Sequence, residues 1–141
     1  MIIAVDFDGT IVRHEYPRIG KEIPFAMQTL KQLMLDGHML ILNTVREGDL
    51  LNEAVEYCRQ RGVEFYAVNA SNPDEYGSSN RSRKVNADVF IDDHNLGGLP
   101  DWGIIYQMIK SGRPLQPYEG IEQEQTYNYK RKKGFLSRLF G

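Results

Sequence analysis

Two aspartates, one residue apart, follow the first apolar run of the chain. Residues 1–4 (Met-Ile-Ile-Ala) have the length and β-branched content of a buried strand, and residues 5–10 (Val-Asp-Phe-Asp-Gly-Thr) come directly after them. Side chains alternate along a strand, so Asp6 and Asp8 are expected on the same side. Two close carboxylates repel each other, and a divalent cation with oxygen ligands is the usual compensation.

The glycine after this acid pair fits two interpretations. Gly9 allows a sharp turn that brings backbone N–H groups close to a ligand, which predicts a place for it in substrate binding. The alternative is a strand that ends in an ordinary solvated acidic turn, since Asp and Gly are common turn residues. The rest of the chain favours the first interpretation.

Strand and helix patterns alternate along the chain. Apolar runs predict strands at residues 1–4, 39–42, 64–68 and 88–91, and helical spacing predicts helices from Pro24 to Gly37, from an Asp49 N-cap to Gly62, and over residues 102–111. Residues 11–22 are expected to form a loop or short hairpin. Residues 69–83 form a polar loop too long for a simple connector, followed by a short helical turn around Lys84. This order predicts an α/β protein, a three-layer Rossmann-like sandwich around a central parallel sheet.

Polar side chains follow the ends of three predicted strands. In a parallel sheet the strand ends share one edge, where ligands bind. The groups expected there are Asp6 and Asp8 after the first strand, Thr44 after the second, and Asp92 and Asp93 after the fourth, with Lys84 nearby. Arg46 lies just past Thr44, where it either contacts an anionic substrate or sits at the start of a helix.

This set of side chains suits phosphoryl transfer. An aspartate is a weak nucleophile, so Asp6 is matched to a strongly electrophilic centre such as a metal-bound phosphoryl group. Asp8 is placed to protonate the leaving alcohol and then to deprotonate the hydrolytic water. A magnesium ion would neutralise the carboxylates, with Asp6, Asp8, Asp92 and Asp93 as candidate ligands. Thr44 and Lys84 would stabilise charge on the phosphoryl oxygens.

Together these motifs resemble the haloacid dehalogenase superfamily, in particular its phosphatase branch, which has Asp at the second acid position. The resemblance rests on Asp-Phe-Asp-Gly-Thr, Thr44, Lys84 and Asp92-Asp93 in that order, and it covers about residues 1–112. It implies that Asp6 is the nucleophile, Asp8 the general acid and base, Thr44 and Lys84 phosphate ligands, and Asp92 the acidic metal ligand, with Asp93 acting through water.

One departure from the family pattern concerns the cap. Members often carry a separate domain over the site, whereas the segments before and after Thr44 have no room for one, so this chain resembles a minimal, capless member. An open site suits a phosphorylated small molecule or an exposed phosphate on a larger substrate. Alternatively, a second protomer of a homo-oligomer supplies the lid. Sugar phosphates, nucleotides, lipid-derived phosphates and nucleic-acid ends all stay open as substrates.

Length and composition predict a soluble globular protein of one domain. The resemblance implies that this is a catalytic domain, expected at residues 1–115. The 141 residues are 41% hydrophobic and 26% charged, and the net charge of -2 argues against a polyanion-binding body. The single Cys58 excludes an intramolecular disulfide and favours a reducing compartment, so we expect a cytoplasmic protein.

The remaining residues, 116–141, are expected to form a polar and basic tail. The basic run 130–133 precedes a short apolar segment that ends at Phe140. Contact of residues 130–140 with nucleic acid or an anionic membrane, docking on the domain or on a partner, and a solubilising terminus are all open.

The sequence therefore predicts a magnesium-dependent phosphomonoesterase that works through an aspartyl-phosphate on Asp6. A second hypothesis is a binding or regulatory module that keeps the fold without turnover and is targeted by its tail. A third keeps the chemistry but passes the phosphoryl group to an acceptor other than water. Four crowded carboxylates favour the first over the second, because a site without catalysis has no physical reason to keep them.

Overall fold

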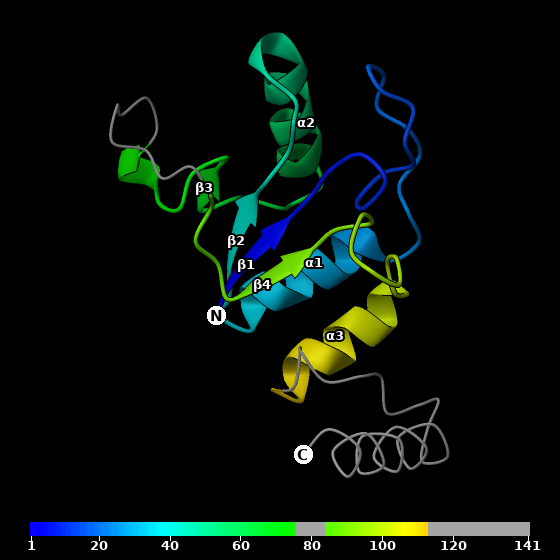
Figure 1. The fold of residues 1–141 in the computed structure, drawn as a ribbon, viewed down its shortest axis with the longest axis vertical. Helices are drawn as coiled ribbons and strands as arrows, with labels where there is room; N and C mark the ends of the chain where they lie inside the picture. The colour runs from blue at the N-terminus through cyan, green and yellow to red at the C-terminus, as the bar shows by residue number, and fades with distance from the viewer. Residues whose placement is uncertain (76–83, 113–141) are drawn as a thin grey trace, which may run out of the picture. The chain divides into compact units, whose positions relative to one another are not determined.

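A computed structural model describes residues 1–75 and 84–112 and shows a four-stranded parallel sheet (Figure 1). The strand order is β3-β2-β1-β4, with β1 at Ile2–Val5, β2 at Met39–Leu42, β3 at Ala67–Val68 and β4 at Val89–Ile91. The helices are α1 (Ala26–Leu35), α2 (Gly48–Gln60), the short 3-10 helix η1 (Pro73–Glu75) and α3 (Trp102–Lys110). The predicted parallel α/β class is confirmed.

Residues 1–106 form one compact unit, and the fold and site described below belong to it. The predicted tail and the loop residues 76–83 lie outside the described residues, so the hypotheses about contacts of residues 130–140 keep the status of predictions. In the part of the chain that the structure covers, no helix combines the length and apolar character needed to cross a membrane.

The register of the sheet aligns the strand ends that carry the polar side chains. Val5 pairs with Leu42 on one side and with Ile91 on the other. The ladder continues one step further, because Asp6 N–H donates to Ile91 O at 3.0 Å and Asn43 N–H donates to Val5 O at 2.8 Å. The residues after β1, β2 and β4 therefore start from one common edge, as the sequence predicts.

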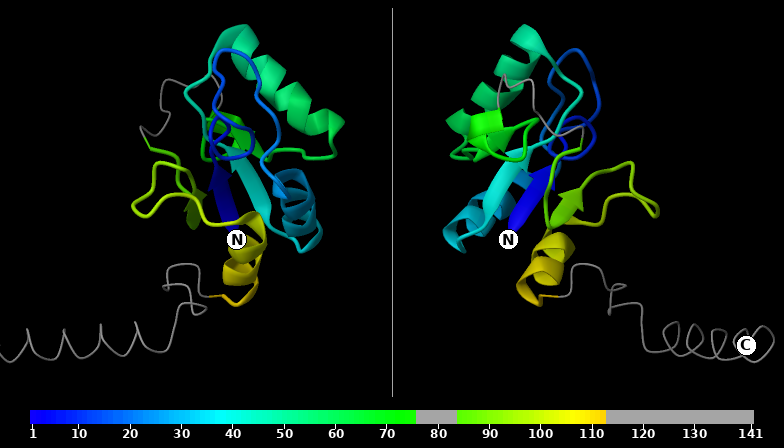
Figure 2. Two further views of the ribbon diagram at one scale, coloured as in Figure 1. Left: turned by 90° about the vertical axis from the view of Figure 1, so that its right-hand side faces the viewer. Right: turned by 60° about the vertical axis from the view of Figure 1, so that its left-hand side comes forward.

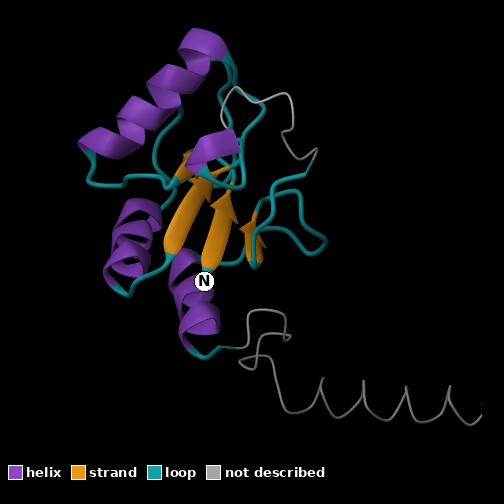
Figure 3. Cartoon of the chain, turned by 90° about the vertical axis from the view of Figure 1, so that its left-hand side faces the viewer, coloured by secondary structure: helices purple, strands orange, loops and turns teal. Residues whose placement is uncertain are grey.

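The two faces of the sheet are covered differently. Helices α1 and α2 lie on one side (Figure 3), and the strand residues Ile3, Val5, Leu40 and Leu42 are buried. The other face carries a cluster of Ala4, Ile41, Ala67 and Ala70, against which Ile2, Val85, Ala87 and Phe90 pack. This cover comes from the chain that leaves β3 and enters β4, so among the described residues the predicted third layer is a loop rather than a helix.

The segment between β1 and α1 forms the predicted short hairpin. Ile23 N–H donates to Ile11 O at 2.9 Å, and Arg13 N–H donates to Lys21 O at 2.8 Å. This segment, residues 11–23, is called the flap below. It lies beyond the carboxyl ends of the strands, beside α2 (Figure 2).

The helix ends agree with the sequence at α1 and differ at α2. Gly37, predicted to end the first helix, has φ +92°, and its N–H donates to Met34 O at 3.0 Å, a turn suited to glycine. The predicted N-cap Asp49 is instead inside the first turn of α2, and Glu47 is the N-cap, without a side-chain cap hydrogen bond. A carboxylate in the first turn still favours the helix, through the helix dipole.

Two other predictions differ from the structure. The third strand was expected over residues 64–68, but β3 is Ala67–Val68, which pairs with β2 alone. The helical turn expected around Lys84 is absent from the described residues, where Lys84 lies in a bend.

Candidate functional site

A cleft of about 310 Å³ opens at the carboxyl edge of the sheet. It is lined by Asp6, Asp8, His14, Tyr16, Asn43, Thr44, Val45, Asp92 and His94. Four side chains predicted from the sequence, Asp6, Asp8, Thr44 and Asp92, therefore meet at one cavity. The flap adds His14 and Tyr16, which come from no strand end.

Asp6 sits directly after β1, at the centre of the acidic groups. Burial raises its pKa from the ordinary 3.8 to about 7, and the neighbouring Asp92 and Asp93 carboxylates add to the shift, against a hydrogen bond from the Phe7 N–H that lowers it. The negative charge of Asp6 is therefore costly without a compensating positive group. A site of this kind favours a bound cation.

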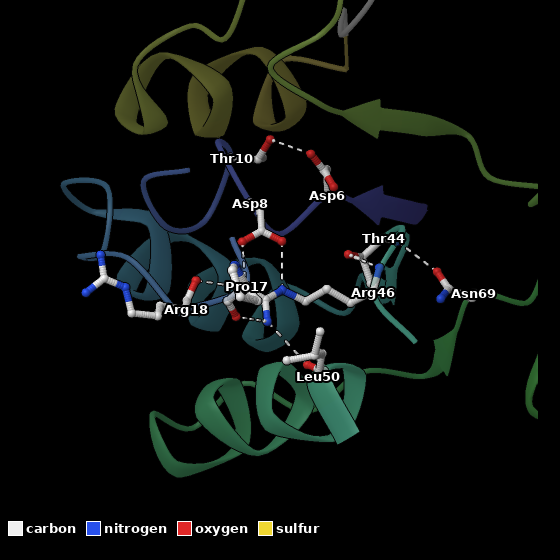
Figure 4. Close-up of polar contacts among 9 residues, drawn as sticks. All are labelled: Asp6, Asp8, Thr10, Pro17, Arg18, Thr44, Arg46, Leu50 and Asn69. Atoms are coloured by element: carbon white, nitrogen blue, oxygen red, sulfur yellow. Dashed lines mark hydrogen bonds and ion pairs between the residues drawn. The ribbon is translucent and has the colours of Figure 1, made fainter. Parts of the chain in front are cut away.

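The Thr10 hydroxyl connects Asp6 to Asp93. Its oxygen accepts from Asp93 N–H at 3.1 Å, and its proton is within reach of Asp93 Oδ1 at 3.2 Å. Asp6 Oδ2 is 3.4 Å from the same hydroxyl (Figure 4). Thr10 is fully buried. This contact fixes the end of β4 against the turn that follows β1.

Gly9 makes this approach possible, which differs from its predicted role. The residue has φ +85°, and a Cβ built on it would collide with the Asp93 carboxylate. Its N–H donates to Val12 O at 2.7 Å, inside the turn. The Gly9 N–H is therefore already hydrogen-bonded, and the residue admits the Asp93 carboxylate; the part predicted for Gly9 in substrate binding stays a prediction.

The carboxyl end of β4 carries a group of potential metal ligands. One ligand atom from each of Asp92, Asp93 and His94 lies within 4.8 Å of the others. Asp92 Oδ1 also accepts from His94 N–H at 2.8 Å, which holds the turn together. This cluster can bind a metal ion, as predicted for Asp92 and Asp93. Asp6 is outside the trio, but the Asp92 and Asp93 carboxylates both contribute to raising its pKa.

Asp8 faces a different partner from the other acids. Its Oδ2 accepts from Arg46 Nε at 2.7 Å and its Oδ1 accepts from Arg46 Nη2 at 2.8 Å (Figure 4). Both side chains are buried, Arg46 completely. A buried bidentate ion pair therefore already neutralises the charge of Asp8, and its part as a metal ligand stays a prediction.

Every N–H of the Arg46 guanidinium has a protein acceptor. Besides Asp8, Nη1 donates to Pro17 O at 3.1 Å and to Leu50 O at 3.4 Å, and Nη2 donates to Arg18 O at 3.0 Å. Guanidinium has five N–H donors, so none is left over for a phosphate. The prediction that Arg46 contacts an anionic substrate was therefore wrong. The residue instead joins Asp8 to the flap and to α2.

Thr44 keeps a position suited to an anionic ligand. Its N–H donates to Asn69 Oδ1 at 2.8 Å, and its hydroxyl oxygen accepts from Arg46 N–H at 3.2 Å (Figure 4). These two bonds fix the side chain at the cleft wall. The hydroxyl proton can then be donated to a ligand in the cleft.

Lys84 lies apart from the cleft. Its Nζ is 5.8 Å from the centroid of the Phe90 ring, and Lys84 is not among the residues that line the cavity. Phe90 packs against the sheet face that β4 shares with Ala4 and Ile41. The structure therefore does not bring Lys84 to the phosphate position predicted for it.

The comparisons with known proteins give one relative. No family model and no curated protein matches the chain. A solved structure, described as that of a conserved protein coded by a locus from Bacteroides thetaiotaomicron, is 64% identical to it, with a TM-score of 0.75 and a match that covers 79% of this chain and 91% of that one. The chain belongs to the family of this conserved Bacteroides protein. That relationship supports the fold of this family member.

Several lining residues of this family member were not predicted as site residues. Asn43 directly precedes Thr44, so the rule that strand ends line the site would have found it. His14 and Tyr16 lie in the flap, where no periodicity marks them. His94 adjoins the acid pair after β4, and that adjacency was its only signal.

Proposed function

We propose that this protein is a magnesium-dependent phosphomonoesterase of the haloacid dehalogenase type. The observation that carries the proposal is the position of Asp6 at the end of the central strand, in the cleft, with its pKa raised to about 7 by burial and by Asp92 and Asp93. A carboxylate whose charge is uncompensated is matched to a ligand that brings positive charge.

The donor set fits a hard divalent cation. Asp92 and Asp93, with Asp6 beside them, offer the carboxylate oxygens that Mg²⁺ prefers, and they lie at the edge of an open cleft. A bound Mg²⁺ would neutralise charge on these carboxylates and on phosphoryl oxygens.

Asp6, Asp8 and Thr44 have different roles in the two steps of the proposed reaction. Asp6 attacks phosphorus, the bond to the leaving oxygen breaks with its electron pair on that oxygen, which takes up a proton, and an aspartyl-phosphate forms. Water then attacks the same phosphorus, Asp8 accepts a proton from that water, and the Asp6 carboxylate is regenerated as inorganic phosphate leaves. Thr44 Oγ1 donates to a phosphoryl oxygen from the wall of the cleft.

Phosphate release from a panel of phosphate monoesters, with Mg²⁺ or with chelator, tests the proposal. We expect release that needs Mg²⁺ and is lost in Asp6→Asn. Asp74→Asn, which removes an exposed carboxylate on η1 that does not line the cleft, is the matched control and should behave as the native chain. Full activity of Asp6→Asn would refute the mechanism. Mg²⁺ binding without turnover on any substrate would instead favour a binding or regulatory module.

A further inference from the structure

The residues that line the cleft differ in burial and in polarity. The half-buried ones are polar and follow strand ends: Asp6, Asn43, Thr44 and Asp92. The exposed ones form the outer wall of the cleft: His14, Tyr16, Val45 and His94. A phosphoryl group held by Asp6 and Thr44 would lie in the inner, polar part. The rest of the substrate would then contact the outer wall.

The outer wall carries exposed apolar surface on two different elements. Tyr16 comes from the flap and is 47% exposed, and Val45 follows β2, next to Thr44, and is 88% exposed. Large apolar side chains that stay exposed at a cleft gain stability when a ligand covers them. The part of the substrate beyond the phosphate is therefore expected to be apolar on at least one side.

Tyr16 is held in place although it lies in the flap. Arg46 Cζ is 5.2 Å from the centroid of its ring, a cation–π distance. The same guanidinium donates to the carbonyl oxygens of the next two residues, Pro17 at 3.1 Å and Arg18 at 3.0 Å. Arg46 is itself buried and paired with Asp8. Because the ring is already fixed, a ligand that packs on it pays little to order it.

The charge of the cleft limits what else the substrate can carry. None of the described residues that line it is a lysine or an arginine. The donors of Arg46 are all used within the protein, and Lys84 lies over Phe90, apart from the cleft. A second phosphate or a carboxylate on the substrate would meet the acids of the cleft without such a partner, which disfavours it.

We infer that the outer wall binds an aromatic ring of the substrate against Tyr16, so that the site takes small aromatic monophosphates. In these aryl and arylmethyl phosphates the ring lies directly beside the phosphate oxygen or one carbon away from it. A flat aromatic group gains both burial of apolar area and ring–ring contact at Tyr16, whereas a polyol chain gains less of each. This inference rests on the proposed function, and it makes Tyr16 a specificity-determining residue.

Three substrates with primary alkoxide leaving groups test this inference on the native chain. They are benzyl phosphate, cyclohexylmethyl phosphate, which has a similar size but no flat ring, and glycerol 1-phosphate, each with saturating Mg²⁺. We expect kcat/KM to be highest for benzyl phosphate and at least about tenfold lower for glycerol 1-phosphate. Equal values, or a preference for either of the other two, would overturn the inference and leave the proposed function intact.

Two variants of Tyr16 separate ring contact from support of the flap. In Tyr16→Ala we expect kcat/KM for benzyl phosphate to fall about 5–10-fold, with little change for glycerol 1-phosphate. Tyr16→Phe keeps the ring and should keep the native preference. Tyr66→Ala, at an exposed tyrosine that is not among the lining residues, is the matched control. An equal loss on both substrates, or no loss, in Tyr16→Ala would overturn the inference.

Binding of benzylphosphonate, which cannot be hydrolysed at its P–C bond, tests the ring contact without turnover. Calorimetric titration with Mg²⁺ should show tighter binding of benzylphosphonate than of methylphosphonate in the native chain. Tyr16→Ala should lose about 5–10-fold of the benzylphosphonate affinity and none of the methylphosphonate affinity. Equal affinities for the two phosphonates would overturn the inference, and the native chain decides alone if Tyr16→Ala does not fold. Phosphonate binding as expected, without phosphate release from any ester, would refute the proposed function instead.

Discussion

The indole N–H of Trp102 donates to the carbonyl oxygen of Thr10 at 3.0 Å, across 92 residues of sequence. Both residues are buried. The bond attaches the start of α3 to the turn whose Thr10 hydroxyl lies between Asp6 and Asp93. Trp102 does not line the cleft, so it supports the turn that carries Asp6 and Asp8 from outside.

We expect Trp102→Phe to destabilise the protein by about 1–3 kcal/mol, because the Thr10 carbonyl loses its donor in a buried place and the smaller ring leaves space. Urea unfolding measures this change. Tyr106→Phe is the matched control on the same helix: it removes an exposed hydrogen bond to Asp36 of 2.7 Å and should cost less than about 1 kcal/mol. Equal losses for the two variants would contradict a supporting role for the indole bond.

Arg46→Met should destabilise the protein by about 3–5 kcal/mol, because the buried Asp8 carboxylate loses its only charged partner among the described residues. Adding Asp8→Asn to Arg46→Met should recover part of the loss, since no charge is then left unpaired. The free energies of unfolding of the single and double variants form the measurement. Additive losses would show that the pair is not coupled.

We expect Gly9→Ala to lower the free energy of unfolding by more than backbone strain alone would. Gly9 and Gly37 both have positive φ, +85° and +92°, but a Cβ at Gly9 meets the Asp93 carboxylate whereas a Cβ at Gly37 meets nothing within 4 Å. Gly37→Ala therefore reports the strain by itself, about 1–2 kcal/mol. We expect Gly9→Ala to lose more stability than that and to weaken Mg²⁺ binding, measured by calorimetric titration. Unchanged Mg²⁺ affinity in a folded Gly9→Ala protein would argue against Asp93 as part of a cation site.

The metal-free protein should lose stability as the pH rises. The pKa of Asp6 is raised, chiefly by burial, from 3.8 to about 7, so between these values the folded state holds a proton that the unfolded chain has released. The cost of ionising Asp6 is absent below the lower value, grows across the interval and is complete above the upper one. Thermal unfolding in chelator should therefore show a melting temperature that falls over this interval.

Asp6→Asn provides the comparison for this pH dependence. It has no charge to bury, so its melting temperature should fall less over the same interval and exceed that of the native chain at the alkaline end. Saturating Mg²⁺ should raise the melting temperature of the native chain more than that of Asp6→Asn. Parallel pH profiles for the two proteins would show that Asp6 is not the titrating group.

Residues next to a strand end could be predicted from the sequence. Apolar runs identify β1, β2 and β4, and parallel pairing brings their carboxyl ends to one edge, so Asp6, Thr44 and Asp92 were expected together and line one cleft. Their positions follow from local pattern and one topological rule, and neither depends on which side chain touches which.

The sequence did not show which charged side chains would pair in the folded protein. Arg46 and Asp8 are 38 residues apart, and no local pattern indicates that they form a buried ion pair in which each neutralises the other. Lys84 lies over Phe90, a position that no local pattern in the sequence indicates. The sequence by itself therefore determined the parallel α/β core and the edge at which the acids gather. Only the tertiary structure decided which charges pair and which are left for a ligand, because desolvation and distance act between residues that the chain order does not relate.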